Sequence, residues 1–462
     1  MRSSKSTRVR ARYLCVWLLA LAACQEKPVP GVCCTTDADC ARLGGILPRG
    51  CPDGFVCRNL LCEAEACVAA GDCSIEQPVC DPGSASCTSC TGNADCDRYA
   101  DAPVCDSATG GCRACSLDTE CASDVCDVDT GHCVVEGEVI YASPGGADTA
   151  RCSHEQPCSL NRAIVVAAAD PSSSIVRMLP GTYGTTLRVL SGTVMFVGTG
   201  AVIQPLQSTI DAVNIQSGAN VTIRGATLDL SLNNEILCDG TAAHAVLTLQ
   251  DLSIVAYQLG PIFINCSASM RRVKMTASDG AHIRIGNDST LDADRLLLTS
   301  RLGVDCIGKR MSVRITNSIM DGAAVGFSPS DDMSSESRLS LWFNTIVSSG
   351  SGAVGCGATT TNALVENNVL VAAGADTVQG PCTIVSNNVV FPQSTALPTS
   401  NRIVDPRLID PAGHDLRLRA DSPAIDAAAQ PASLVTDHDF FGNPRPSGPQ
   451  SDIGAHEHSP SS

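Results

Sequence analysis

The sequence has few aromatic residues, few basic residues and no long apolar stretch beyond its N-terminus. Aromatic residues make up 3% of the 462 residues, and Trp17 and Trp342 are the only tryptophans. Sugar-processing clefts usually hold substrate rings on aromatic faces, so this scarcity counts against such a cleft. Phe343 beside Trp342 offers one modest platform at most. No stretch of eighteen apolar residues follows residue 23, so we expect no membrane-spanning helix after it.

Basic residues are outnumbered by acidic ones, 31 to 48, which gives a formal net charge of −17. Residues 1–23 hold five of the basic residues and no acidic ones, so the remainder carries 26 against 48, a net charge of −22. Such a surface repels nucleic acid and bare anionic lipid, and we expect neither as a partner. The 44% of apolar residues is enough for a large core and excludes wholesale disorder.

The N-terminus reads as an export signal. Five basic residues precede a short apolar run, Tyr13 to Ala22, which suits a secretory signal and is too short to span a bilayer. The ending Leu-Ala-Ala-Cys24 resembles a bacterial lipoprotein signal. That resemblance implies removal of residues 1–23, lipidation of Cys24 and contact with the membrane through the lipid. Gln25, in place of Asp, implies the outer membrane and exposure at the cell surface. An ordinary secretory signal is the alternative, and both interpretations export the chain.

Cysteines are concentrated in residues 33–136, after a linker at 24–32. Eighteen of the 27 lie between Cys33 and Cys133, and in an exported chain such density indicates disulfides. A longer first unit is followed by three units of four cysteines, each with an acidic residue before its second cysteine. The four-cysteine units are Cys67, Cys73, Cys80, Cys87; Cys90, Cys96, Cys105, Cys112; and Cys115, Cys121, Cys126, Cys133.

Units this short cannot bury enough apolar area to fold without bridges, so we interpret the region as a semi-rigid disulfide stalk. The connectivity stays open, since four cysteines allow three pairings. Zinc is disfavoured because the Cys-x-x-Cys pairs straddle unit junctions and export favours oxidation. Calcium is a weaker alternative, with possible ligands Asp37, Asp39, Asn93 and Asp95.

Residues 137–458 contain short apolar strands that recur with a single turn residue inside each copy. The turn residues, separated by 20 to 27 positions, are Gly198, Gly225, Asp251, Arg272, Arg295, Asn317, Asn344, Asn367 and Asn387. This period without long helices predicts a β-solenoid, in which each coil is stabilised by its neighbours. Gly and Asn suit a bend that needs positive φ, and the four asparagines could stack as a ladder. The alternative is a β-sandwich, with hairpin turns at Asp239-Gly240, Asp279-Gly280 and Asp321-Gly322.

Both ends of this region have features that would cover an open solenoid. Ser159 followed by Leu160 to Ala169 predicts a short N-capped helix just before the first strand, at Ile175 to Leu179. Cys152 and Cys158 are expected to close the loop leading into it. At the other end we expect charge-assisted bonds to pin a capping segment. The polar residues of that segment are Asp437, Asp439, Arg445, Asp452 and Glu457.

Three sequence motifs resemble the right-handed parallel β-helix proteins of the pectin-lyase-like superfamily. They are Val139 to Gly146, Met178 to Tyr183 and the ending Asp452 to Glu457. The resemblance implies an all-β, right-handed parallel β-helix over residues 137–458. It says little about chemistry, because such folds include lyases, hydrolases, esterases and non-catalytic adhesins.

The candidate catalytic residues are weak. The segment Gly303 to Arg310 resembles the Gly-Asp-Asp-Cys-Ile segment of polygalacturonase-like glycosidases, but Val304 replaces the first acid and leaves Asp305 alone. Asp331 and Asp332 lie in a serine-rich loop, where paired acids are usually only solvated. His282 and Arg284 alternate as in a strand and so share a face, which could bind sugars externally.

The remaining cysteines fit the coil length. Cys238 and Cys266 are 28 residues apart and Cys356 and Cys382 are 26 apart, so each pair could bridge neighbouring coils. Cys306 is then single and is expected to be a buried small hydrophobe.

The leading hypothesis is a non-catalytic surface lipoprotein whose β-helix presents a face for glycan or protein. The alternative is an extracellular polysaccharide lyase or glycoside hydrolase. We expect no cofactor, apart from the weak calcium alternative.

Overall fold

The structure is a computed structural model that describes residues 55–58, 61–64, 67 and 69–459 with internal gaps. The gaps are residues 85, 171–173, 208–210, 217, 233, 242–243, 257–261, 279–282, 331–335, 351, 375, 393–396 and 430–435. The predicted signal, Cys24, the linker and residues Asp37 and Asp39 lie outside the described residues. The chain divides into two compact units, one ending at Val135 and one beginning at Glu136.

The cysteine-rich unit is built from small modules. Strands β1 (Phe55–Arg58) and β2 (Leu61–Ala64) pair antiparallel ahead of them. Each module then has one 3-10 helix and one antiparallel strand pair. Their bounds are η1 (Ala70–Asp72), β3 (Val79–Asp81) and β4 (Ser86–Thr88); η2 (Asn93–Cys96), β5 (Val104–Cys105) and β6 (Cys112–Arg113); and η3 (Asp118–Glu120), β7 (Cys126–Asp127) and β8 (His132–Cys133).

Each module contains two disulfides, which join its first cysteine to the third and its second to the fourth. The pairs are Cys67–Cys80, Cys73–Cys87, Cys90–Cys105, Cys96–Cys112, Cys115–Cys126 and Cys121–Cys133. This assigns the connectivity that cysteine spacing leaves open. Every bridge stays within its own module, so each module closes its own loops.

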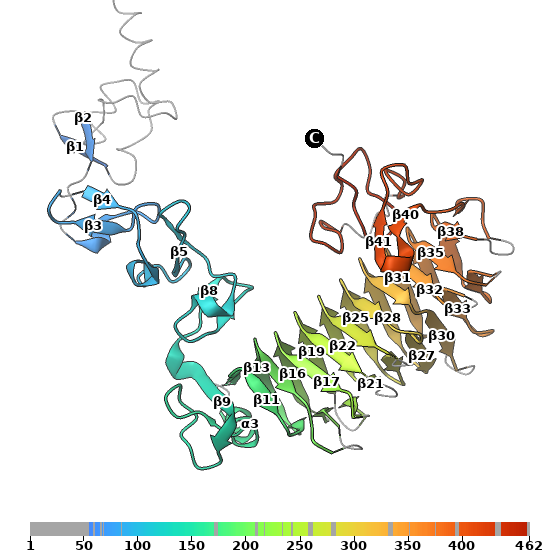
Figure 1. The fold of residues 1–462 in the computed structure, drawn as a ribbon, viewed down its shortest axis with the longest axis horizontal. Helices are drawn as coiled ribbons and strands as arrows, with labels where there is room; N and C mark the ends of the chain where they lie inside the picture. Colours follow the sequence, from blue (N-terminus) through green and yellow to red (C-terminus); the bar gives the residue numbers. More distant parts are fainter. Residues whose placement is uncertain are drawn as a thin grey trace, which may run out of the picture. The chain divides into compact units, whose positions relative to one another are not determined.

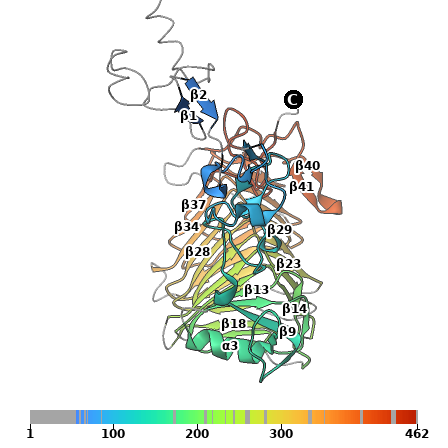
Figure 2. The same ribbon diagram turned by 90° about the vertical axis from the view of Figure 1, so that its left-hand side faces the viewer.

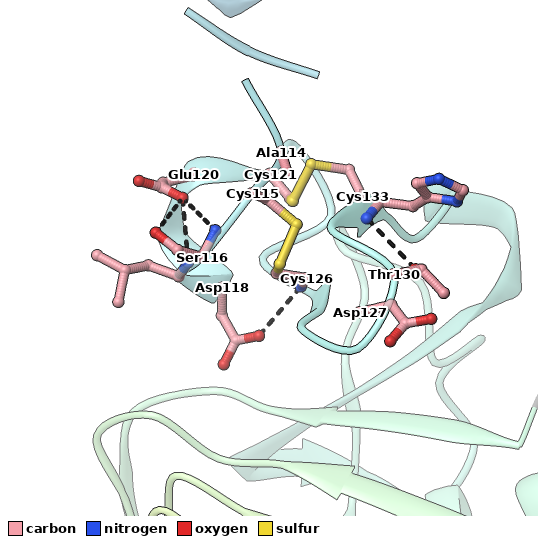
Figure 3. The surroundings of a disulfide bond; sticks show 12 residues. Ala114, Cys115, Ser116, Asp118, Glu120, Cys121, Cys126, Asp127, Thr130 and Cys133 are labelled. Carbon is pink, nitrogen blue, oxygen red and sulfur yellow. Dashed lines mark hydrogen bonds between the residues drawn. A yellow bond between two sulfur atoms is a disulfide. The ribbon is translucent and has the colours of Figure 1, made fainter. Parts of the chain in front are cut away.

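The acidic residue before each second cysteine holds the start of the 3-10 helix. In the third module a carboxylate oxygen of Glu120 accepts the backbone N–H groups of Ser116 at 2.8 Å and Leu117 at 3.0 Å (Figure 3). Asp95 accepts from Thr91 and Gly92 in the same way, and Asp72 accepts from Ala69. The repeated acid is therefore a backbone cap in every module.

Glu120 also predicts an acid-sensitive module. Its hydrogen bond with Arg113 lowers the pKa of Glu120 to about 2. Because this folded pKa lies below the unfolded value, the stabilisation is present above about pH 4.5 and is lost as the pH falls towards 2. We expect Glu120→Gln to cost about 1 kcal/mol at pH 7 and to differ little from the wild type near pH 2. The loss of stability would be measured by hydrogen exchange of the Ser116 and Leu117 amides. Asp129→Asn, at an exposed residue of the same module, is the control. Equal protection at pH 7 would contradict the capping role.

Successive modules contact one another. The Arg98 guanidinium donates to the carbonyl oxygens of Cys73 and Pro78 in the preceding module, both at 2.9 Å. Val104 packs against the cysteines of the following module. These contacts join neighbouring modules, and the semi-rigid stalk stays a prediction.

The second unit is a parallel β-helix of about eight turns, which confirms the predicted fold class. Three sheets run along it, and within each sheet every neighbouring pair of strands is parallel (Figures 1 and 2). We call them the first, second and third sheets. Since consecutive strands in the chain alternate among the sheets, the sandwich alternative is wrong.

The first sheet contains β9 (Val139–Ala147), β10 (Ile175–Met178), β13 (Gly192–Val197), β16 (Ala219–Arg224), β19 (Val246–Gln250), β22 (Ser267–Arg271), β25 (Thr290–Asp294), β28 (Ser312–Thr316), β31 (Arg338–Trp342), β34 (Ala363–Glu366) and β37 (Ile384–Ser386). The second contains β11 (Gly181–Tyr183), β14 (Ala201–Ile203), β17 (Thr227–Leu230), β20 (Ser253–Ala256), β23 (Lys274–Ala277), β26 (Leu297–Thr299), β29 (Ile319–Gly322), β32 (Thr345–Ser348), β35 (Val369–Ala372), β38 (Val389–Phe391) and β39 (Arg402–Ile403). The third contains β12 (Leu187–Val189), β15 (Val213–Ile215), β18 (Ile236–Asp239), β21 (Ile262–Asn265), β24 (Ile283–Ile285), β27 (Val304–Gly308), β30 (Val325–Pro329), β33 (Val354–Cys356) and β36 (Val378–Gln379).

The predicted turn residues lie between the first and second sheets, and most of them have positive φ. The exceptions are Gly198 and Asn344. A Cβ on Gly198 would lie 2.6 Å from the Cε of Met178 and 3.0 Å from the Cβ of Ala226, so a crowded site, and not positive φ, favours glycine there. On the coil of Asn344 the positive φ, 56°, belongs to Phe343, and the prediction was wrong by one residue.

An asparagine ladder exists and includes Asn344 as predicted, but its next members are Asn368 and Asn388, one position after the predicted Asn367 and Asn387. Asn344, Asn368, Asn388 and Asn401 are buried inside the coils, and each Nδ2 of the first three donates to the Oδ1 of the next rung at 2.9–3.0 Å. Asn317 and Asn367 bond instead to Asp294 and to Ala429, outside this stack. The same stack is apolar in the earlier coils, where it contains Leu252 and Leu296.

The N-terminal end of the β-helix is covered as predicted. Helix α3 (Leu160–Ala169) begins after Ser159, whose side chain accepts the Arg162 N–H, and it packs against β9, β10, β12 and β13. The Cys152–Cys158 disulfide closes the preceding loop, and Tyr141 on the edge strand β9 donates its N–H to Cys152. Edge backbone groups are thereby paired within the chain.

The C-terminal segment, described at residues 405–429 and 436–459, covers the side of the last coils, and we call it the strap. It includes the antiparallel pair β40 (Leu408–Asp410) and β41 (Asp415–Leu418), joined by η7 (Pro411–Gly413). Apolar residues of the strap pack on outward-facing residues of the second sheet, including Ile319, Val369 and Val389. The predicted capping segment is thus mainly a lateral cover.

Candidate functional site

The structure brings together two of the predicted site residues, Arg284 and Asp305. They are register partners on the neighbouring strands β24 and β27 of the third sheet, and both point outward. Arg284 Nη2 lies 3.9 Å from Asp305 Oδ2, and the side chains are 46% and 38% exposed. On the other side, the Arg284 guanidinium lies 5.9 Å from the ring centroid of Phe263.

This arrangement does not equip Asp305 for acid–base catalysis. A hydrolase needs a second carboxylate about 5–10 Å away, on the other side of the scissile bond. Among the described residues the charged partner of Asp305 is Arg284, which neutralises it on an exposed strand face. His282, Asp331 and Asp332 lie outside the described residues. Cys306, next to Asp305, points into the core, and burial raises the pKa of its thiol, so it is no nucleophile.

Other exposed acids of the β-helix are also paired with arginine on a neighbouring coil. Arg310 bonds to Asp288 and Arg314 to Asp292, each through two nitrogen atoms, 22 residues apart. Arg272 bonds to Asp251 in the same way, 21 residues apart. Such pairs join coil to coil and place opposite charges side by side along the outer face.

Sequence reasoning missed one pair of carboxyl groups, Asp211 and Glu235. They lie one coil apart, just before β15 and β18, and burial followed by a hydrogen bond with Asp211 raises the pKa of Glu235. Their separation of 24 residues matches the coil period and could have revealed them. A direct hydrogen bond places the two carboxyl groups closer than glycosidases require, so they do not bracket a sugar.

The predicted polar set in the strap forms a buried network. Arg445 Nη1 donates to Glu457 Oε2 at 2.9 Å, and both side chains are fully buried. Asp439 accepts the backbone N–H of Glu457, and Asp452 accepts that of His458. Burial raises the pKa of both Asp452 and Glu457. The network pins the strap, and Glu457 also lines a hollow of about 550 Å³ together with Asn443, His456 and His458.

Asp437 departs from this prediction. Its carboxylate is 88% exposed and bonds to His438, while only its backbone oxygen accepts from Arg445. The exposed side chain is therefore not part of the buried network.

Neither the predicted aromatic platform nor the metal alternatives find support in the described residues. Trp342 and Phe343 are 8% and 4% exposed because the strap packs over them, so neither ring face is free to stack on sugar. Three-cysteine groups lie close enough to hold a metal, but every one of these cysteines is in a disulfide. Asn93 and Asp95 bond to the protein's own backbone.

Comparison with known proteins assigns no residue role. No family model and no curated protein sequence matches the chain. Among solved structures the chain is similar to the crystal structure of the pectate lyase Pel9A, with 14% sequence identity and a TM-score of 0.41. The similarity covers 70% of this chain and 96% of the lyase chain. It is a likeness of fold, which the three parallel sheets already define.

Proposed function

We propose that the protein is a surface lipoprotein whose β-helix binds glycan and performs no catalysis. The observation that carries this proposal is the pairing of exposed acids with arginines from neighbouring coils, as in Arg284–Asp305 and Arg314–Asp292. These pairs lie along strand faces, whereas catalysis needs groups that converge on one reacting bond, so the arrangement favours recognition.

Export is supported by the nine disulfides of the described residues, because such bonds persist in oxidising compartments. They include Cys238–Cys266 and Cys356–Cys382, which join neighbouring coils. No helix among the described residues is long and apolar enough to cross a membrane. The proposed anchor, lipid on Cys24, follows from the resemblance of residues 21–24 to a lipoprotein signal.

The anchor is tested by the mass of the mature protein. We expect the N-terminal peptide to begin at Cys24 and to carry acyl chains, each buried methylene contributing about 0.8 kcal/mol to membrane binding. Cys24→Ser should release the protein from washed membranes into the soluble exported fraction. An unacylated N-terminus elsewhere would reject the lipoprotein interpretation while leaving export intact.

The binding function is tested on a glycan array, together with a reducing-end release assay on the glycans that bind. We expect saturable binding to a restricted glycan class without release. Arg188→Gln, on the exposed face of β12, serves as a surface control. If the wild type does release reducing ends, the variants Asp305→Ala and Asp305→Asn decide the role of Asp305. Loss of release in both variants would establish the alternative, a hydrolase or lyase centred on Arg284 and Asp305. Release that is retained in Asp305→Asn would not fit an acid role for this residue.

A further inference from the structure

The outer face of the first sheet has a hollow of about 330 Å³ across β25, β28 and β31. This volume lies at the lower end of the range of ligand pockets. Its polar lining residues are Thr290, Asp292, Ser312, Arg314, Arg338, Ser340 and Trp342. The hollow is separate from the Arg284–Asp305 pair, which is on the third sheet.

Register places the lining in ordered rows. Thr290, Ser312 and Arg338 are partners on three successive coils, and Asp292, Arg314 and Ser340 form the next row. Neighbouring coils are about 4.8 Å apart, so the rows present polar groups at a regular spacing along the helix axis.

The charges of the hollow leave one cation unpaired. Asp292 and Arg314 neutralise each other through their two-nitrogen contact. Arg338 is exposed, and its guanidinium makes no hydrogen bond or ion pair with another described residue. In a strongly acidic chain, this hollow therefore offers a local excess of hydrogen-bond donors.

Trp342 supplies the second observation. Its side chain is more than nine-tenths buried, and its indole nitrogen is buried without a hydrogen-bond partner among the described residues. An N–H group left in this state costs about 1–3 kcal/mol. Because the strap covers the ring and the indole nitrogen is itself buried, Trp342 lines the hollow without offering a ligand a stacking face or a donor.

We propose that this hollow is the glycan-binding site of the β-helix. It takes one or two sugar residues, whose oxygen atoms accept hydrogen bonds from Arg338 and the hydroxyl groups of Ser312 and Ser340. This inference rests on the proposed binding function and specifies where it occurs.

Trp342 also provides the measurement, because it is the only tryptophan after residue 17. The exported full-length protein is titrated with the oligosaccharide that binds best on the array, and tryptophan fluorescence is followed. We expect a saturable change in the fluorescence of Trp342, which lines the hollow. Arg338→Gln should weaken binding at least about tenfold, and Ser312→Ala with Ser340→Ala should weaken it further. Arg188→Gln should bind as the wild type.

The outcomes separate the site from the function. If oligosaccharide binds but fluorescence is unchanged and Arg338→Gln binds normally, the site lies elsewhere and only the present inference is overturned. If no glycan binds, both the inference and the proposed function fail. If the circular dichroism spectrum of Arg338→Gln is like that of the wild type, its loss of glycan binding is not caused by misfolding.

Discussion

Replacing Arg445 by methionine should loosen the strap and destabilise it by about 3–5 kcal/mol. The guanidinium is fully buried and donates to Glu457 and to the carbonyl oxygens of Asp452 and Gly454. Methionine fills similar volume but leaves a buried carboxylate and two carbonyl oxygens without their donor. Since the pKa of Glu457 is already raised by burial, loss of its cation would favour its protonation further.

Hydrogen exchange localises this effect. The N–H groups of Gly454 and Ala455 donate to Asn367 and Thr345 on the β-helix, so their protection reports whether the strap is docked. We expect their exchange to accelerate strongly in Arg445→Met, while amides of β16 stay unchanged. Arg417→Met is the matched control, because Arg417 is half-exposed and its pair with Asp415 should contribute little to stability. Unaltered exchange in Arg445→Met would show that apolar packing alone holds the strap.

The fold could be predicted from the sequence because the spacing of the repeats gives the length of one coil. Turn residues 20 to 27 positions apart must stack if each coil covers the next, and the strand register bears this out from Gly225 through Arg295 to Asn387. Disulfides between coils followed the same arithmetic, since Cys238 and Cys266 differ by one coil.

Features without a period could not be predicted in this way. Disulfide connectivity within modules depends on the 3-10 turn that the acid caps, and spacing alone does not define that turn. The burial of Trp342 depends on the strap, which is more than sixty residues later in the chain. Prediction of the candidate site from the sequence had the same limit. The pairing of Arg284 with Asp305 follows from their 21-residue separation. Whether a sheet face is hollow or flat, in contrast, depends on the side chains of three coils together.

The asparagine ladder shows how a correct repeat can hide an error of one residue. The sequence contains Asn367-Asn368 and Asn387-Asn388, and in each pair the first residue makes the positive-φ turn while the second points inward. Both roles favour asparagine, the first for its tolerance of the left-handed region and the second for its amide. Composition therefore could not separate them.

Asn368→Leu should accordingly cost at least about 3 kcal/mol, whereas Asn387→Gly should change stability by about 0.5 kcal/mol or less. The Asn368 side chain accepts from the backbone and side-chain N–H groups of Asn344 and donates to the carbonyl oxygens of Leu341 and Glu366. Leucine would leave these buried groups unpaired. Glycine at Asn387 keeps the positive φ and removes a side chain outside the ladder.

Urea unfolding monitored through Trp342, one coil from Asn368, would measure both variants. Leucine itself is acceptable in this stack, since Leu252 and Leu296 occupy it in earlier coils. The expected cost therefore arises from the orphaned neighbours and not from the position. Replacing Asn344, Asn368 and Asn388 together by leucine should recover part of the loss per site, because fewer partners are then left unpaired. A triple variant that loses three times the single cost would show that the ladder's rungs act independently.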